Sequence, residues 1–315
     1  MKDDKSEIST TENEVPANDT VIVDGRILLI TGESTNGMHR QECFDICNRK
    51  YYFKYIEFKK TSGKARGLGS LIHLGLAHLY ARMRAKQRGE DHEVYHTPYD
   101  AIKLATVYGM EVDSEKALAC VSGYISKYMA EDREKEILYV EEVFEVNIGG
   151  VAKTVRPDLV YRSKINNKIY IVDHKTTGYL SKNHTVWYSM TYQMLLLQHV
   201  GVALFGNEFG GVIINYIQTG EKMLFKREGV IVCNAAYDDF IPAIIDGQKN
   251  IDEKAGKGKD AYLPTFSEHT CWTRYGICDF YQLCAHNRGE DSEKDSSLTV
   301  SDGRDTGMRM NKRGI

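Results

Sequence analysis

The sequence lacks any long apolar run, and without a stretch of about 18 apolar residues it cannot form a membrane helix. Its first residues, Met1 to Lys5, are mostly charged and lead into polar residues, so we expect no secretory signal peptide. We therefore expect a cytoplasmic protein with no membrane partner. An excess of one charge is also missing, because 41 basic residues face 44 acidic ones. The overall charge therefore gives no sign of a nucleic-acid partner, although a local basic surface could still bind one.

Large apolar residues are scarce at both ends of the chain. We therefore predict disordered tails over residues 1–20 and 289–315, since such segments cannot offset the entropy cost of ordering. The part between them, residues 21–288, is predicted to form one domain, because 42% hydrophobic content suffices for a sizeable core. Seven cysteines in an intracellular protein indicate metal binding or core packing rather than disulfides.

Two β-prone segments, 159–161 and 169–172, are separated by a turn signal at Asn166 and Asn167. This pattern predicts a β-hairpin. A further strand is expected over 139–146, which would add a third strand to form an antiparallel meander. Helices are predicted at 34–58, 67–84, 114–133 and 186–204, and later strands at 211–217 and 224–232. The order of strand, helix and strand after the meander predicts an α/β fold, a mixed central sheet flanked by helices.

Charged residues gather at one end of the predicted hairpin. Asp173 and Lys175 are two positions apart in the second strand and therefore share a face, on the side of Asp158. Two converging carboxylates suit Mg²⁺ or Mn²⁺, which prefer oxygen ligands. Such an ion can generate hydroxide and stabilise charge on a phosphodiester, with the lysine beside it. The alternative is that these residues are ordinary solvated charges of a surface strand.

The residues Pro157-Asp158 and Asp173-His174-Lys175 resemble the signature of the PD-(D/E)XK nucleases. This resemblance implies a restriction-endonuclease-like fold, with Asp158, Asp173 and Lys175 as catalytic residues. It also implies that the metal ligands include both aspartates and the carbonyl group of His174. Glu141 and Glu142 could approach the same ion, although solvent exposure is expected for at least one of them.

Two further elements resemble the RecB-like branch of these nucleases. Gly69 and His73 match a Gly-x-x-x-His helix, which implies that His73 is a metal ligand, whereas His78 does not fit and is expected to be structural. Gln193 matches the start of a Gln-x-x-x-Tyr motif, which implies a catalytic role. Leu197 stands where the tyrosine is expected. The alternative for Gln193 is a residue that bridges core and surface.

The segment from Arg49 to Arg66 is basic and aromatic, with Glu57 as its single acidic residue. Lysines, arginines and stacking rings together suit a DNA-binding surface. The candidate DNA-binding residues are Arg49, Lys50, Tyr51 and Lys54. The alternative is an amphipathic helix with a solvated lysine face and a tyrosine face in the core.

Three cysteines, Cys271, Cys278 and Cys284, lie within fourteen residues near the end of the domain. Thiolates select zinc, copper(I) or iron–sulfur clusters, and a closed site wants a fourth ligand. Spacing alone leaves Cys43 and Cys47 as equal candidates. Cys47-Asn48-Arg49 resembles the Cys-Pro-Arg element of CRISPR-associated RecB-like and AddB-type nucleases, which implies a 4Fe–4S cluster on Cys47 and the three late cysteines. Four-cysteine zinc is the alternative, and either group would act as a staple between the two ends of the domain.

Taken in order along the chain, these motifs imply a metal-dependent DNA exonuclease with a cysteine-cluster staple. The resemblance implies single-stranded DNA as substrate and a pathway of recombination, repair, or phage or CRISPR DNA processing. A helicase, a recombinase or a CRISPR integrase is the protein partner expected for such a nuclease. The alternative function is a catalytically silent DNA-binding or assembly subunit with the same fold, which the leucine at position 197 allows.

Overall fold

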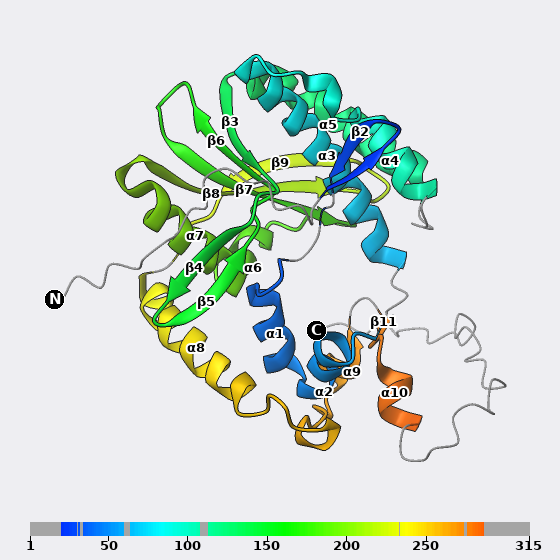
Figure 1. Cartoon of the computed structure of the whole chain (residues 1–315), viewed down its shortest axis with the longest axis vertical. Helices are drawn as coiled ribbons and strands as arrows, with labels where there is room; N and C mark the ends of the chain where they lie inside the picture. Colours follow the sequence, from blue (N-terminus) through cyan, green and yellow to red (C-terminus); the bar gives the residue numbers. More distant parts are fainter. Residues whose placement is uncertain are drawn as a thin grey trace, which may run out of the picture.

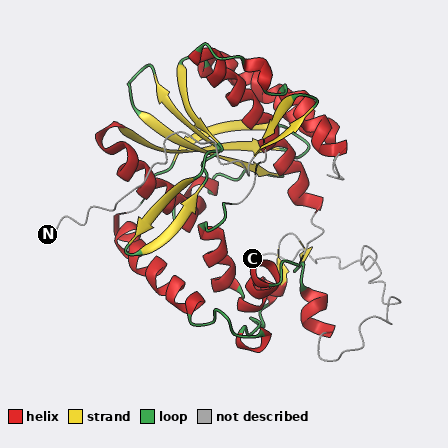
Figure 2. Ribbon diagram, viewed as in Figure 1, coloured by secondary structure: helices red, strands yellow, loops and turns green. Residues whose placement is uncertain are grey.

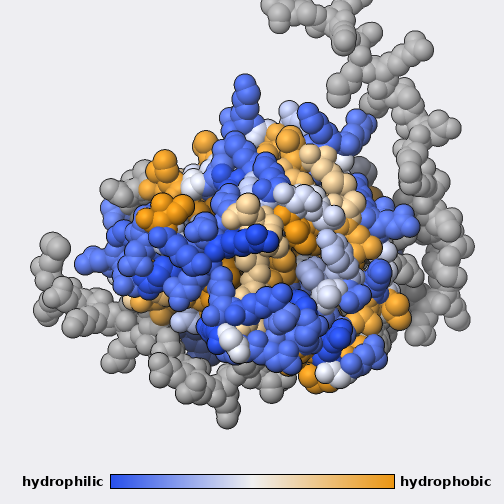
Figure 3. Space-filling model, turned by 90° about the horizontal axis from the view of Figure 1, so that it is seen from above, coloured by the Kyte–Doolittle hydropathy of each residue, from blue (hydrophilic) through white to orange (hydrophobic). Residues whose placement is uncertain are grey.

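The computed structural model describes residues 20–29, 31, 34–59, 64–107, 113–232, 234–273 and 276–286. Apart from Thr20, where strand β1 begins, the predicted tails over 1–20 and 289–315 lie outside these ranges. Among the described helices, none is both long and apolar enough to cross a membrane. Viewed from above, the surface is mainly hydrophilic, with apolar groups in a strip between hydrophilic regions (Figure 3).

A five-stranded mixed sheet forms the centre of the molecule (Figure 1). Its strands, in spatial order, are β3 (Lys135–Val140), β6 (Leu159–Ser163), β7 (Ile169–Thr177), β8 (Phe209–Gln218) and β9 (Leu224–Gly229). Strands β7 and β8 run parallel, and the other neighbours are antiparallel. The β6–β7 pair is the predicted hairpin, and the predicted α/β fold with a mixed sheet is confirmed.

Helices cover both faces of this sheet (Figure 2). One face packs against α3 (Lys64–Arg88) and α5 (Ser114–Asp132), with α4 (Pro98–Val107) packed against both helices. The other face packs against α7 (Tyr192–Phe205) and α8 (Asn234–Asp252), together with the hairpin of β4 (Phe144–Ile148) and β5 (Val151–Val155). The short helix α6 (His184–Tyr188) precedes α7, so the single helix predicted for 186–204 is two helices.

Neighbouring residues of β7 enter different cores. Val172 belongs to the core under α3 and α5, whereas Ile171 belongs to the core under α7. Because side chains alternate along a strand, Asp173 follows the face of Ile171 and His174 follows the face of Val172. The strand therefore presents its acidic residue toward α7 and its histidine toward α3 and α5.

The predicted strand over 139–146 is wrong as a single element. The chain leaves the sheet after Val140, and β4 begins at Phe144. Between them Glu141 has a φ of 53°, in the left-handed region that ends a regular strand. Strands β4 and β5 consequently form a separate hairpin, and β3 pairs with β6 rather than with β4.

The helix predicted for 34–58 is also interrupted. It consists of α1 (Met38–Ile46), α2 (Asn48–Tyr51) and a π-helical turn (Tyr52–Ile56), because Cys47 between the first two is extended, with a φ of −162°. The remaining elements are β1 (Thr20–Val23), β2 (Arg26–Leu29), α9 (Glu268–Cys271), β10 (Trp272–Thr273), β11 (Gly276–Ile277), α10 (Tyr281–His286) and 3₁₀ turns at His92–Val94, Gly206–Glu208 and Lys259–Ala261. In Figure 1 the blue α2 region lies beside the orange α9–α10 region. Segments far apart in sequence therefore meet there.

Candidate active site

A cavity of about 350 Å³ opens where α1, α3, β5, β7 and α7 meet. Five of the predicted catalytic and metal-binding side chains line it: His73, Asp158, Asp173, Lys175 and Gln193. They come from α3, from the residue before β6, from β7 and from α7. Tertiary packing thus brings side chains up to 120 residues apart in sequence to the wall of one cavity.

On the α7 side of the cavity, three side chains form a closed polar triangle. Lys175 Nζ lies 2.7 Å from Asp173 Oδ2 and donates to Gln193 Oε1 at 2.8 Å. Gln193 Nε2 in turn donates to Asp173 Oδ1 at 2.6 Å. Gln193 can reach both partners because it lies in the first turn of α7, where the Thr191 side chain caps the helix. The arrangement fixes the lysine ammonium beside one carboxylate.

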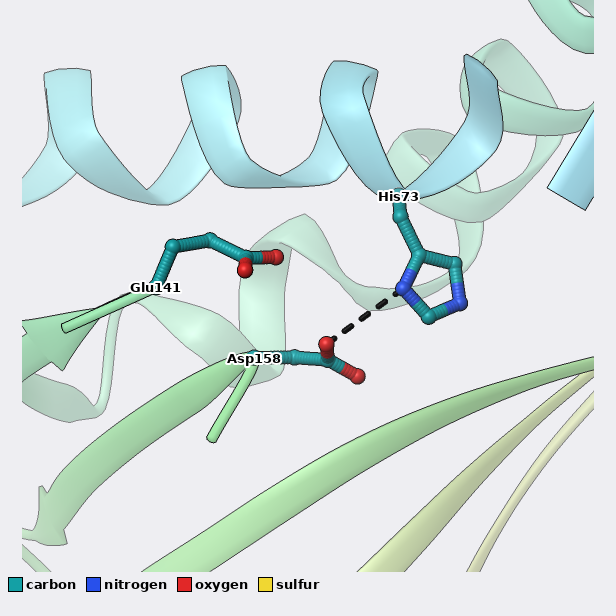
Figure 4. A group of neighbouring side chains, drawn as sticks. All are labelled: His73, Glu141 and Asp158. Carbon is teal, nitrogen blue, oxygen red and sulfur yellow. Dashed lines mark ion pairs between the residues drawn. The ribbon is translucent and has the colours of Figure 1, made fainter. Parts of the chain in front are cut away.

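Opposite this triangle, His73, Glu141 and Asp158 converge (Figure 4). His73 points down from α3 toward Asp158, and its Nδ1 lies 3.3 Å from Asp158 Oδ1. One ligand atom from each of the three residues lies within 4.8 Å of the others. The Glu141 side chain is buried, and Arg156 Nε lies 3.6 Å from its Oε2. Glu142, in contrast, binds Arg84 and is half exposed.

The left-handed backbone of Glu141 is what turns its side chain inward. A non-glycine residue with a φ of 53° is uncommon, and such conformations often occur at functional sites. The sequence identified Glu141 only as one of two candidates, because no local pattern shows that the strand stops at Val140. Its inward position is therefore a finding of the structure.

Burial and charge act in opposite directions on the groups of this site. Burial by itself raises the pKa of Asp158, but the charge and hydrogen bond of His73 hold the pKa well below its usual range. Burial lowers the pKa of His73, but Asp158 outweighs it, so the net direction is upward. Burial raises the pKa of Asp173 in spite of Lys175. A positive charge near these buried carboxylates stabilises their ionised forms, as His73 does for Asp158.

The His174 side chain lies on the opposite face of the sheet from Asp173, and hydrogen bonds hold both its backbone and its ring. Its backbone N–H donates to Asp158 Oδ2, and its ring Nδ1 lies 2.7 Å from Asn215 Nδ2. Burial lowers the pKa of His174 to about 3, so the ring is neutral and Nδ1 can accept from the amide. Asn215 Nδ2 also donates to the Tyr124 hydroxyl at 2.9 Å. The Tyr80 ring stacks on His174 with a centroid distance of 6.1 Å.

This hydrogen-bonded group continues into a buried ion pair. Arg227, on β9, donates to both carboxylate oxygens of Asp132 at 2.8 and 3.0 Å and to the Tyr124 hydroxyl. The Tyr80 hydroxyl also donates to Asp132, at 2.8 Å. The residues come from α3, α5 and β9, so the network connects the helical layer to the sheet beneath Asp173 and Lys175. Most polar atoms of this buried network are hydrogen-bonded, whereas the buried Asn215 Oδ1 has no partner. The paired groups support the backbone at His174.

The donor set of the cavity fits a hard divalent cation. Asp158, Asp173 and Glu141 offer carboxylate oxygens, and His73 offers a ring nitrogen. Leu197, where the related motif has tyrosine, is 1% exposed and lines the same cavity. The wall of the cavity is therefore apolar at this position.

Thr265 contacts two of the four predicted cluster cysteines, Cys47 and Cys271. The Thr265 N–H donates to Cys47 Sγ at 3.5 Å, and Cys271 Sγ donates to the Thr265 carbonyl at 3.5 Å. Burial raises the pKa of the Cys284 thiol, and the nearby thiols of Cys47 and Cys278 raise it further. Thiol donors suit a soft metal or an iron–sulfur cluster, but among the described residues no three cysteine sulfurs lie within 4.8 Å of one another. The other early candidate, Cys43, packs instead in an aromatic core.

The predicted DNA-binding residues have different surroundings. Tyr51 is only 3% exposed and packs with Phe44 and Tyr262, so its predicted use as a base-stacking ring is wrong and the core alternative holds. Arg49 Nε donates to the Tyr262 carbonyl at 2.6 Å, and Lys54 Nζ lies over the ring of Tyr55. Lys50, also predicted to bind DNA, is partly exposed. A helical period shows which residues share a face but not which face is covered.

Comparisons with known proteins identify the family of the chain. The family model of the PD-(D/E)XK nuclease superfamily matches residues 38–285. A crystal structure of a putative exonuclease from Eubacterium rectale is 14% identical, with a TM-score of 0.44 over 80% of this chain and 88% of that chain. The crystal structure of SSO0001 is 14% identical, with a TM-score of 0.28 over 59% of this chain and 85% of that chain. No protein of curated function matches the sequence. The chain belongs to the PD-(D/E)XK nuclease superfamily.

Proposed function

We propose that the protein is a divalent-metal-dependent deoxyribonuclease that degrades single-stranded DNA from an end. The observation that carries this proposal is the convergence of Asp158, Asp173 and Lys175 with His73 around one cavity. Walls from α1, α3, β5, β7 and α7 surround that cavity, which suits the end of a strand better than a continuous duplex.

The proposed ligands of Mg²⁺ or Mn²⁺ are Asp158, Asp173, His73 and the carbonyl group of His174, with Glu141 as an additional ligand. When bound, the ion supplies a Lewis acid for the phosphate oxygens and lowers the pKa of a coordinated water. The carboxylates are pre-positioned for it. Asp158 is held by the backbone N–H of His174, and Asp173 is held by Gln193.

Lys175 is proposed to orient the attacking water and to stabilise charge on the scissile phosphate as an ammonium. Burial lowers the pKa of Lys175, but the carboxylate of Asp173 outweighs it and raises the pKa overall, so the group stays protonated. Gln193 keeps the ammonium in place through a 2.8 Å hydrogen bond, so little reorganisation is needed when the substrate binds. The network beneath His174 holds the backbone between the two catalytic residues of β7.

The cysteines are proposed to hold a 4Fe–4S cluster, with zinc as the alternative. Cys47 lies near the start of the domain and Cys271, Cys278 and Cys284 near its end, and Thr265 contacts the first two. A group bound there would join the N-terminal helices to the C-terminal segment. It would thereby lower the conformational entropy of the unfolded chain and stabilise the fold. Anaerobic purification followed by a visible spectrum and metal analysis tests this assignment. A broad brown absorption indicates the iron–sulfur cluster, whereas a colourless zinc protein indicates the alternative.

The nuclease proposal is tested with linear and circular single-stranded DNA in the presence of Mn²⁺ or Mg²⁺. We expect degradation of the linear DNA alone, and no degradation in EDTA. Lys175→Met should lower the rate on the order of 10²–10³-fold, as expected when a positioned charge that stabilises a transition state is removed. Asp173→Asn should lower it at least as much, because a metal ligand and the partner of Lys175 are lost together.

Lys257→Met is the matched control, because Lys257 is exposed in the loop after α8. It should cleave at the wild-type rate. Cleavage of circular DNA would refute exonuclease action but would still show that the protein is a nuclease. Full activity of folded Asp173→Asn and Lys175→Met variants would refute the site.

A further inference from the structure

The segment between Lys175 and Gln193 exposes an unusual number of large apolar side chains. Its four members, which we name the α6 surface, have exposed fractions of 73%, 66%, 55% and 60%: Tyr179, Val186, Trp187 and Met190. Clustered apolar groups on a protein surface commonly mark an interaction site. Lys175 and Gln193, the residues on either side of this segment, both contact Asp173, so the two ends of the segment lie at the candidate active site.

A chain of contacts connects the α6 surface to the catalytic lysine. Lys175 is paired with Tyr216 in the β7–β8 register, and its Nζ lies 5.5 Å from the ring centroid of Tyr188. The His184 ring lies 6.1 Å from that of Tyr216, and the Trp187 ring lies 5.1 Å from that of His184. Helix α6 therefore covers the sheet next to Lys175, with Trp187 at its outer side.

The charge of this region suits a polyanion. The sequence has no aspartate or glutamate from His174 to Asn207, and Lys182 is exposed within it. On the neighbouring strand, the carboxylate of Glu228 is already engaged by Lys226 and by the Thr185 hydroxyl. A ligand that carries both negative charge and flat apolar rings matches the combination of lysine and exposed aromatic rings.

We propose that the α6 surface is a base-stacking platform that guides single-stranded DNA into the cavity. Trp187 and Tyr179 stack on successive bases, while Lys182 lies near the phosphates. Base–aromatic stacking requires the faces of unpaired bases, so a duplex cannot use the platform in the same way. The inference rests on the proposed nuclease function and specifies how the enzyme selects a single strand.

The test measures binding of fluorescent oligothymidine and of a duplex of equal length by anisotropy in EDTA, which prevents cleavage. Trp187→Ala should weaken binding of the single strand about 5- to 100-fold and leave duplex binding unchanged. Trp187→Phe should restore most of the loss. The control is Ile165→Ala, since Ile165 is 85% exposed at the opposite end of β7, and it should bind DNA as the wild type does.

Tryptophan fluorescence gives an independent signal. The chain has two tryptophans, so Trp187 is the only one left in Trp272→Phe. Oligothymidine should quench its emission if a base stacks on the ring. Unchanged affinity of Trp187→Ala, or equal losses for the single strand and the duplex, would overturn the proposal. A wild-type dimer that dissociates in Trp187→Ala would instead assign the surface to a second copy of the chain.

The two proposals fail in different ways. If the wild type neither binds nor cleaves DNA, the nuclease function itself is refuted. If the wild type cleaves single-stranded DNA and Trp187→Ala binds and cleaves it equally well, only the stacking platform is refuted.

Discussion

His78, in the middle of α3, provides a test of how burial controls the stability of this fold. The side chain has no exposed surface. Its Nε2 accepts from the Leu29 N–H at 3.1 Å, and its Nδ1 lies 3.1 Å from the carbonyl oxygen of His96. A carbonyl can only accept, so Nδ1 carries the proton and the ring is neutral. Protonation of Nε2 would direct a second N–H against that of Leu29.

The size of the expected change in the free energy of unfolding follows from the pKa of His78. Burial is the largest cause that lowers the pKa of His78 from 6.5 to about 4. Between these values the unfolded chain binds more protons than the native protein, so stability falls as the pH falls. At 1.36 kcal/mol per pKa unit, the full effect is about 3 kcal/mol, of which about 2 kcal/mol is lost by about pH 5.

Urea unfolding of the wild type and of His78→Gln measures this loss at about pH 7.5 and about pH 5. Glutamine does not titrate, and its carbonyl oxygen can accept from the Leu29 N–H. The difference in unfolding free energy between the two proteins should therefore shift by about 2 kcal/mol against the wild type at the lower pH. A difference that stays constant with pH would refute the assignment of a buried neutral histidine.

Two further variants change a residue of β8 and a residue of the loop that follows it. Asn215→Leu removes the amide beside His174 Nδ1 and should weaken Mn²⁺ binding about 10- to 100-fold in calorimetric titration, as is typical for groups behind metal ligands; unchanged affinity would contradict that role. Ile217→Ala, in the same strand, is its control for a loss of packing alone. Gly220→Ala would bring a Cβ within 2.3 Å of the Gly178 carbonyl oxygen, so its unfolding free energy in urea should fall by about 1–3 kcal/mol. An equally stable variant would show that this loop moves freely.

The β6–β7 hairpin could be predicted because its evidence is local. Alternating β-prone residues and an Asn-Asn turn specify two antiparallel strands, and the structure pairs Leu159 with Val172. The period of two then places Asp173 and Lys175 on one face without further information. Gln193 and His73 were predicted from their resemblance to short motifs, and their side chains line the same cavity.

Glu141 and Tyr51 show where local patterns are insufficient. Residues 139–146 alternate as one strand would, but a left-handed φ at Glu141 ends the strand and turns this carboxylate inward. The helical period around Tyr51 is compatible with a solvent-facing or a core-facing ring. Only the packing of Tyr262 against it, from more than 200 residues away, decides for the core.

The sequence by itself determined the chemistry of this protein: which carboxylates, lysine and cysteines are present, and which of them share a strand face. Periodicity and turn propensity act over a few residues, so they are readable from the chain. The tertiary structure alone decided which distant residues became neighbours of these groups and which side chains stayed exposed. Packing against distant elements placed Glu141 beside His73, held His174 from below through Asn215, and left Trp187 exposed. Such choices depend on contacts between remote segments, which no local pattern encodes.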